Sequence, residues 1–227
     1  MLRKLSFTLT VAALLLTACS SPATEAPATA SPAAPATAAE PSASGDDIRT
    51  YSIISDETKA SYAVGEIIIN QNNQFNLAVG TTNTVSGDIH LNFTHPEQST
   101  VGPITVDISA LKSDSKRRDE AIRKDWLESA KYPLATFTPT EIKGLPDEYA
   151  DGAEITFEIV GDLTIRGATR STTFSVKATL KDEKLTGTAT ATVLMTDFNF
   201  EAPNIAGILK AENEAKLELK FVALPTS

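Results

Sequence analysis

The chain has 227 residues and a formal net charge of −9, with 20 lysine and arginine residues against 29 aspartate and glutamate residues. This acidic balance argues against nucleic acid as a partner, because negative charge repels phosphate backbones. A single cysteine excludes an intramolecular disulfide. With only two histidines, the composition also argues against a structural zinc site and against a cysteine–histidine catalytic pair.

The N-terminal segment, residues 1–18, has the composition of an export signal. Two basic residues at positions 3 and 4 precede an uncharged, mostly apolar run over positions 5–16, which is too short for a membrane-spanning helix. The run ends in the letters L-T-A-C at Cys19, which resemble a bacterial lipobox, where a signal peptidase cuts before a lipid-modified cysteine. We therefore predict that Cys19 is lipidated, with acyl chains such as palmitate as the anchor. An ordinary secretory signal with an incidental cysteine is the alternative.

Residues 19–45 consist almost entirely of alanine, proline, serine and threonine. Such a composition cannot bury enough apolar surface to offset the entropy lost on ordering, so it predicts a disordered linker. The folded domain is then expected over 46–227. The lipid anchor would hold this exported domain on a membrane of the bacterial cell envelope, facing the periplasm or the exterior.

Most of the domain alternates apolar and polar residues with a period of two, the pattern of strands that have one buried face. In 154–180, two such runs flank a break at Arg166-Gly167 and predict an antiparallel hairpin. Further strands are predicted over 51–55, 59–66, 84–93, 104–110, 135–142, 185–195 and 215–223. The uncharged, amide-rich stretch 66–88 is interpreted as a loop that leads into the strand at position 84.

One segment, 115–127, departs from the period of two and has the composition of a helix. Ile122 and Trp126 are spaced i, i+4, so they share one face that can pack onto the sheet. Five cations lie within nine residues of this segment, at positions 116, 117, 118, 123 and 124. They fit an anionic headgroup or membrane surface; the alternative is a solvated helix face paired with acidic residues at 119, 120 and 125.

The strand count is eight or nine, with one short helix and no alternation of strands and helices. The fold class is therefore all-β. Antiparallel strands that each bury one face form either a two-sheet sandwich or a closed barrel. A barrel of about eight strands can hold one small ligand.

Four segments resemble the signature of the YceI-like polyisoprenoid-binding family. They are Arg118-Asp119 with Trp126-Leu127 and the run Tyr132 to Phe137; Gly161 to Arg170; Thr84 to Ile89; and Asp197-Phe198. The resemblance implies a lipocalin-like antiparallel β-barrel that holds an isoprenoid, a quinone or another amphiphile, with no catalytic residues to carry over. The family often has a histidine two residues after its arginine–aspartate pair. Ala121 takes that place here, so a headgroup contact through that histidine is not expected.

A ligand inside such a barrel would contact inward-facing side chains. The candidate lining residues are Phe137, Phe157, Ile159, Leu163, Phe174, Val176, Gly187, Ala189, Ala191 and Phe198. Three consecutive inward positions, 187, 189 and 191, are small, and they leave volume for a chain-like ligand because protein interiors otherwise pack without voids. The alternative is that a phenylalanine at 137, 157 or 174 fills this space from across the barrel.

These observations lead to three hypotheses. The first is an extracytoplasmic, membrane-tethered protein, monomeric or homodimeric, that sequesters or carries a long apolar lipid such as an isoprenoid or quinone, without any other cofactor. The second is a structural or interaction lipoprotein with a filled barrel. The third, a lipid-acting hydrolase, needs a nucleophile–base pair, which His90 on a polar strand face and His95 in a turn do not supply. The sequence therefore indicates a binding protein, with no catalytic and no metal site.

Overall fold

The structure is a computed structural model that describes residues 45–226. The predicted signal segment, Cys19 and nearly all of the predicted linker lie outside the described residues. The chain from Ser44 to Ser227 forms one compact unit with its own hydrophobic core. Within the described part, every helix is too short or too polar to cross a bilayer.

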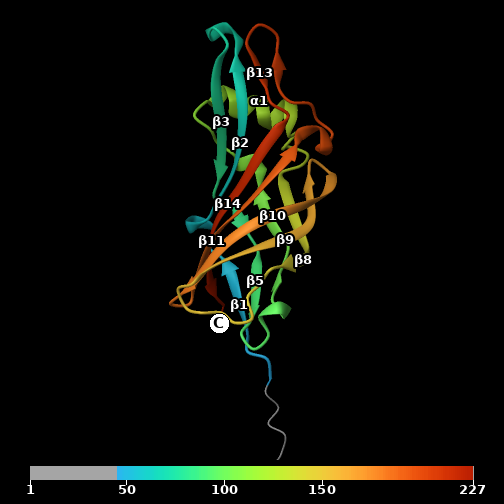
Figure 1. Cartoon of the computed structure of the whole chain (residues 1–227). Helices are drawn as coiled ribbons and strands as arrows, with labels where there is room; N and C mark the ends of the chain where they lie inside the picture. The colour runs from blue at the N-terminus through green and yellow to red at the C-terminus, as the bar shows by residue number, and fades with distance from the viewer. Residues whose placement is uncertain (1–44, 227) are drawn as a thin grey trace, which may run out of the picture. The chain divides into compact units, whose positions relative to one another are not determined.

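Antiparallel strands make up most of this unit (Figure 1). The strands are β1 Ile48–Ile53, β2 Lys59–Ile68, β3 Gln74–Thr82, β4 Val85–Ser86, β5 Asp88–Asn92, β6 Thr100–Val101, β7 Ile104–Asp107, β8 Leu134–Lys143, β9 Glu154–Ile165, β10 Ala168–Lys181, β11 Lys184–Leu194, β12 Asn204–Ile205, β13 Leu209–Ala211 and β14 Glu214–Pro225. The helical elements are α1 Lys116–Ala121, a π-helical turn over Ile122–Trp126, and short 3₁₀ turns over Ser55–Glu57, Ile69–Gln71, Pro96–Gln98, Ile108–Ala110 and Met195–Phe198. The mostly-β class with one short α-helix is therefore confirmed.

The strands form one strongly curled antiparallel sheet. Its order runs β12-β13-β2-β14-β11-β10-β9-β8-β7-β4. β1 pairs with both β14 and β5, and only Gly87 separates β5 from β4, so the sheet curls back toward its earlier strands. The result is a half-barrel whose concave side holds the main hydrophobic cluster.

The predicted number of about eight strands is wrong, because the sheet of the described residues has 14. The stretch 66–88 is not a loop: β2 runs on to Ile68 and returns as β3, in unbroken register with it. Asn72 and Asn73 sit in the turn between them with φ of 58° and 57°, a conformation that asparagine tolerates better than most residues. The stretch after position 197 contains a second unpredicted hairpin, β12–β13.

The predicted hairpin over 154–180 is confirmed as β9 and β10, which pair from Ala168↔Ile165 to Thr179↔Glu154. Arg166 and Gly167 form its two-residue turn, with φ of 52° and 73°. Both values are positive, as a type I′ turn requires, and this turn matches the twist of the flanking strands. The turn therefore fixes which side chains of β9 and β10 face the interior.

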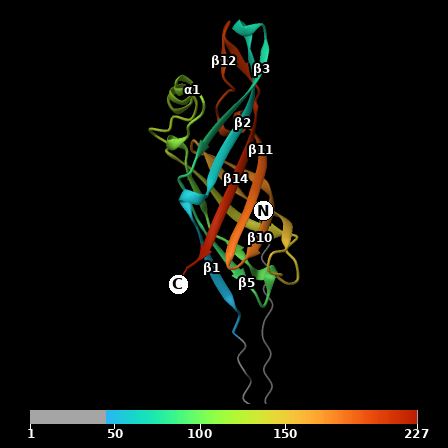
Figure 2. The ribbon, with the colours of Figure 1, turned by 90° about the vertical axis from the view of Figure 1, so that its left-hand side faces the viewer.

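The predicted helical segment 115–127 is helical from Lys116 to Trp126, but its winding changes midway, so the α-helix itself is short. Ser115 begins α1 as its N-cap, and its hydroxyl accepts the N–H of Arg118 at 3.3 Å. After Ala121 the chain takes a π turn, in which the N–H of Leu127 donates to the carbonyl of Ile122 at 2.8 Å. Ile122 and Trp126 are half-buried there. Figures 1 and 2 place α1 at the same end of the unit as the β2–β3 hairpin.

Candidate ligand-binding site

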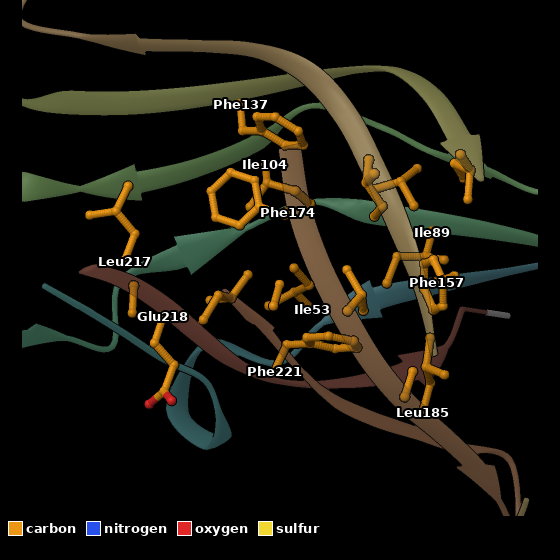
Figure 3. Close-up of a pocket in the computed structure, with 18 of the residues that line it drawn as sticks. Ile53, Ile89, Ile104, Phe137, Phe157, Phe174, Leu185, Leu217, Glu218 and Phe221 are labelled. Carbon is orange, nitrogen blue, oxygen red and sulfur yellow. The ribbon is translucent and has the colours of Figure 1, made fainter. Parts of the chain in front are cut away.

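The curled sheet encloses a cavity of about 220 Å³. Its wall is almost entirely aliphatic and aromatic, and it is built from strands on all sides of the half-barrel together with the loop 145–153 (Figure 3). Glu218 borders the cavity, but its carboxylate turns away from the apolar side chains in Figure 3. A buried apolar cavity of about 150 Å³ holds one benzene molecule, so this cavity has room for roughly nine carbon atoms.

Seven of the ten predicted lining residues lie on the cavity wall. They are Phe137, Phe157, Ile159, Leu163, Phe174, Val176 and Ala189. The rings of Phe137 and Phe174 meet edge to face at one end, with centroids 4.8 Å apart, and Phe157 and Leu185 lie toward the other end (Figure 3). Their contact with a ligand stays a prediction.

Gly187 lies off the wall, because an aromatic ring covers the space that it leaves. Phe221 is its cross-strand partner on β14. A Cβ atom at position 187 would lie 2.6 Å from Cζ of Phe221 and 2.5 Å from the carbonyl oxygen of Lys177. An aromatic ring therefore covers this position, but it is Phe221 of the neighbouring strand and not one of the three phenylalanines considered from the sequence.

Ala191 and Phe198 also lie outside the cavity wall. Ala191 lies farther along β11, where it pairs with Leu217 of β14. Phe198 is 1% exposed and packs with Leu163 and Ala168 in a separate cluster beneath the turn over Met195–Phe198.

Sequence reasoning missed part of the wall. Ile89, Leu91 and Ile104 line the cavity and are absent from the candidate list, although they lie in the predicted strands 84–93 and 104–110. Tyr149 comes from the loop 145–153, whose residues show no periodicity that could predict an inward side chain. Phe221 on β14 is one of the further wall residues outside the candidate list.

One end of the cavity carries a hydrogen-bonded pair of hydroxyl groups. The hydroxyl of Tyr149 lies 2.8 Å from Oγ of Ser99 and donates to the carbonyl of Pro96 at 3.4 Å. Phe93 packs edge-on against the Tyr149 ring, with centroids 5.6 Å apart. Burial raises the pKa of Tyr149 above its ordinary value, so this hydroxyl is protonated at neutral pH.

The second tyrosine on the wall, Tyr62, lies close to α1 and to a buried ion pair. Nη2 of Arg118 is 3.2 Å from Oε2 of Glu66, which also accepts Nδ2 of Asn76 at 3.0 Å. Burial raises the pKa of Tyr62 to about 12, and Arg118 counteracts this only in part. The Tyr62 hydroxyl therefore stays protonated and can act as a hydrogen-bond donor.

We expect the domain to lose stability as the pH rises from 10 toward 12. The pKa of Tyr62 is 10.0 when unperturbed and about 12 in the fold, so the folded state keeps a proton that the unfolded chain loses. The folded state therefore keeps its full stability with respect to Tyr62 below pH 10 and loses stability as the pH rises toward 12. By pH 11 the loss amounts to about 1 kcal/mol. Urea unfolding of wild type and of Tyr62→Phe should show the smaller decline in the variant, and equal declines would contradict the assignment.

The two histidines lie apart and have different surroundings in the described domain. Nδ1 of His90 lies 2.9 Å from Oγ1 of Thr50, and His95 lies near Asp46 and Glu97 on the surface. No group of three or more potential metal ligands gathers within residues 45–226. The absence of catalytic activity stays a prediction.

The family model for the YceI-like domain matches residues 51–223. The chain belongs to the YceI-like family. Protein YceI of Escherichia coli O157:H7 is 37% identical over 75 residues, which cover 33% of this chain and 35% of that protein. A UPF0312 protein of Pseudomonas putida is 32% identical over 133 residues, which cover 55% of this chain and 64% of the relative. The chain thus spans about one third of the first relative and just under two thirds of the second.

Two solved structures share the fold. A polyisoprenoid binding domain from Saccharophagus degradans superimposes with a TM-score of 0.60 at 13% identity, covering 78% of this chain and 98% of that chain. BcnA of Burkholderia cenocepacia gives a TM-score of 0.58 at 20% identity, covering 75% and 98%. The curled antiparallel sheet is therefore the YceI-like fold.

Residues of the YceI-like signature hold the helical segment in place. Asp119 is buried, and its Oδ1 accepts the N–H and the hydroxyl of Ser113 at 2.8 and 2.6 Å. Tyr132 lies against the β9–β10 turn, because a Cβ atom at Gly167 would be 3.0 Å from its ring. In this chain, Asp119 and Tyr132 of the signature therefore make contacts that support the fold.

Arg166, in the same turn, joins two further loops. Its guanidinium forms an ion pair with Glu128 after the helical segment and donates to the carbonyl of Asn199. The hydrogen bond from Arg166 lowers the pKa of the Glu128 carboxyl group. The turn, the helical segment and the loop after position 198 are therefore linked at one end of the sheet.

Proposed function

We propose that this chain is an exported, membrane-tethered protein that sequesters or carries a long apolar lipid, such as an isoprenoid or a quinone, inside its curled sheet. The observation that carries the proposal is the apolar cavity of about 220 Å³ on the concave side of the sheet. The description of the Saccharophagus degradans neighbour as a polyisoprenoid binding domain supports the same ligand class. No turnover is part of this proposal.

Burial of the lipid tail would supply the affinity. Each buried CH₂ group contributes about 0.8 kcal/mol, so roughly nine enclosed carbons contribute about 7 kcal/mol before the costs of binding. Carbons beyond that number would have to widen the half-barrel or lie at its mouth. The hydroxyl groups of Tyr62 and Tyr149 can orient a polar headgroup at either end.

A filled interior is the rival interpretation. It accounts for Gly187, which Phe221 covers, but it does not account for an enclosed space at Ala189, Val176 and Phe157. The enclosed space therefore favours ligand binding.

The membrane tether rests on the sequence. Cys19 is the only cysteine of the chain and follows a short apolar run, and residues 19–45 would let the domain stand away from the bilayer. Under this proposal the anchor keeps the binding domain at the membrane from which an apolar ligand comes.

Expression of wild type and Cys19→Ser in a bacterial host tests both parts. We expect wild type in the membrane fraction and the variant in the soluble fraction of the envelope. Native mass spectrometry of the soluble variant should show a bound apolar lipid, or uptake of added isoprenoid alcohols and quinones. Persistently empty protein that takes up none of them would refute lipid binding. Retention of Cys19→Ser on membranes would refute the anchor alone.

A further inference from the structure

The strand β3 exposes a row of large apolar side chains. Phe75, Leu77 and Val79 are 58%, 54% and 39% exposed, and Ile67, the cross-strand partner of Phe75, is 36% exposed. Residues 67–87 contain no charged side chain. Proteins usually protect the edge of a sheet with lysine, proline or a bulge, and β3 has none of these. This strand is therefore an unprotected edge with an apolar face.

The backbone of β3 is also open on the side away from β2. Among the described residues, β3 pairs with β2 alone, apart from one bridge in which Thr81 exchanges hydrogen bonds of 2.8 and 2.9 Å with Lys112. The N–H and C=O groups of one residue point to the same side of an antiparallel strand, and this side alternates along the chain. The backbone N–H and C=O groups of Thr81 point away from β2. Because the register is unbroken, the same groups of Val79, Leu77 and Phe75 also point away from β2.

We propose that β3 pairs antiparallel with β3 of a second copy of this chain, about a two-fold axis at Leu77. In this register Leu77 lies opposite its own copy, and Phe75 lies opposite Val79. Each of these residue pairs exchanges two backbone hydrogen bonds, because the outward-pointing groups of both strands then face each other. The pairing also joins an aromatic and a β-branched side chain on one face, a favourable cross-strand combination.

A second copy fits this edge better than a lipid bilayer does. Hydrocarbon offers no partner for the outward N–H and C=O groups, and each unsatisfied group there costs several kcal/mol. Charged residues border the apolar row: Lys210 is the cross-strand partner of Ile67, and the carboxylate of Glu212 lies against Gly65. An apolar centre with a charged border is typical of a protein interface. The dimer does not depend on lipid binding by the cavity.

The proposal can be tested on the compact unit 44–227, which contains the described core. Analytical ultracentrifugation at a series of protein concentrations measures its oligomeric state. We expect a dimer that dissociates on dilution. Leu77→Pro removes an N–H that does not bond to β2, and Leu77→Lys places like charges opposite each other. Both variants should be folded monomers at concentrations where wild type is dimeric. Leu134→Lys is the matched control, because Leu134 is 50% exposed on β8, and it should dimerise normally.

Hydrogen exchange identifies the edge directly. The amides of Phe75, Leu77 and Val79 should be protected in the dimer and lose protection on dilution, whereas those of Asn76 and Ala78, which point toward β2, should stay protected. A wild-type monomer at all concentrations would overturn the proposal. A dimer that persists in both Leu77 variants would also overturn it, as would a monomer that binds phosphatidylcholine–phosphatidylglycerol vesicles through Phe75.

Discussion

Replacement of Ala189 by phenylalanine is expected to abolish lipid binding and to leave the sheet folded. Ala189 lines the cavity on β11, between Val176 on β10 and Leu219 on β14. The new ring is the size of a benzene molecule, which needs about 150 Å³, so it would occupy most of the 220 Å³ available. Displacing several tail carbons at about 0.8 kcal/mol each should weaken binding more than about 100-fold.

The cost to folding should be small, because the ring enters space that is already empty. Overpacking costs about 1–3 kcal/mol when a core is full, and we expect the lower end of that range here. Thr190→Phe is the matched control: the same ring stands one residue along the same strand but faces outward. Lipid titration of both variants, with urea unfolding to compare their stability, decides the matter. Unchanged binding by Ala189→Phe would mean that the ligand lies elsewhere.

The sequence predicted the central part of the fold because the periodic pattern and the turn residues agreed. In 154–180 the alternation gave the two faces, and Arg166-Gly167 marked the turn that sets the register. The inward positions on β9 and β10 followed directly, since a residue of a strand can face only one of two sides. Five of the seven predicted residues that lie on the cavity wall come from these two strands.

The hairpin β2–β3 was not predicted because the apolar residues of β3 are not its buried residues. Phe75, Leu77 and Val79 are exposed, whereas Ala78 and Gly80 on the opposite face are buried. A pattern that assigns apolar residues to the interior fails on such a strand. If the edge pairing proposed above is correct, the exposed row is explained by a contact between two chains, which single-chain burial cannot reveal.

The strand partners of the small residues also could not be read from the sequence. Gly187 leaves space that Phe221 fills, and Gly161 leaves space beside the ring of Phe137, 2.7 Å from where a Cβ would lie. Which aromatic ring covers which glycine depends on strand order and register. Only the long-range pairing of β11 with β14 decides it at Gly187.

The cations of the helical segment were open to two interpretations, and the structure separates them at Arg118. Its side chain is 18% exposed and pairs with Glu66, which is 7% exposed and lies on β2. Burial acts to lower the pKa of Arg118, but Glu66 and the adjacent Asp114 raise it overall. Arg118 thus pairs with two carboxylates, Glu66 on β2 and Asp114 just before α1, and its ion-pair partners are not the acidic residues at positions 119, 120 and 125.

Arg118→Met should therefore destabilise the domain by about 3 kcal/mol, because it leaves the Glu66 carboxylate buried without its cation. The double variant Arg118→Met, Glu66→Gln should lose less than the sum of the two single changes, since it removes both charges together. Arg117→Met, one residue away and exposed, should change the free energy of unfolding by less than about 0.5 kcal/mol. Urea unfolding of wild type, Arg118→Met, Glu66→Gln and the double variant measures this cycle, with Arg117→Met as the control. If Arg118 instead binds an anionic headgroup, its replacement would preserve stability and selectively weaken binding of an anionic lipid, and a structural role for the ion pair would be refuted.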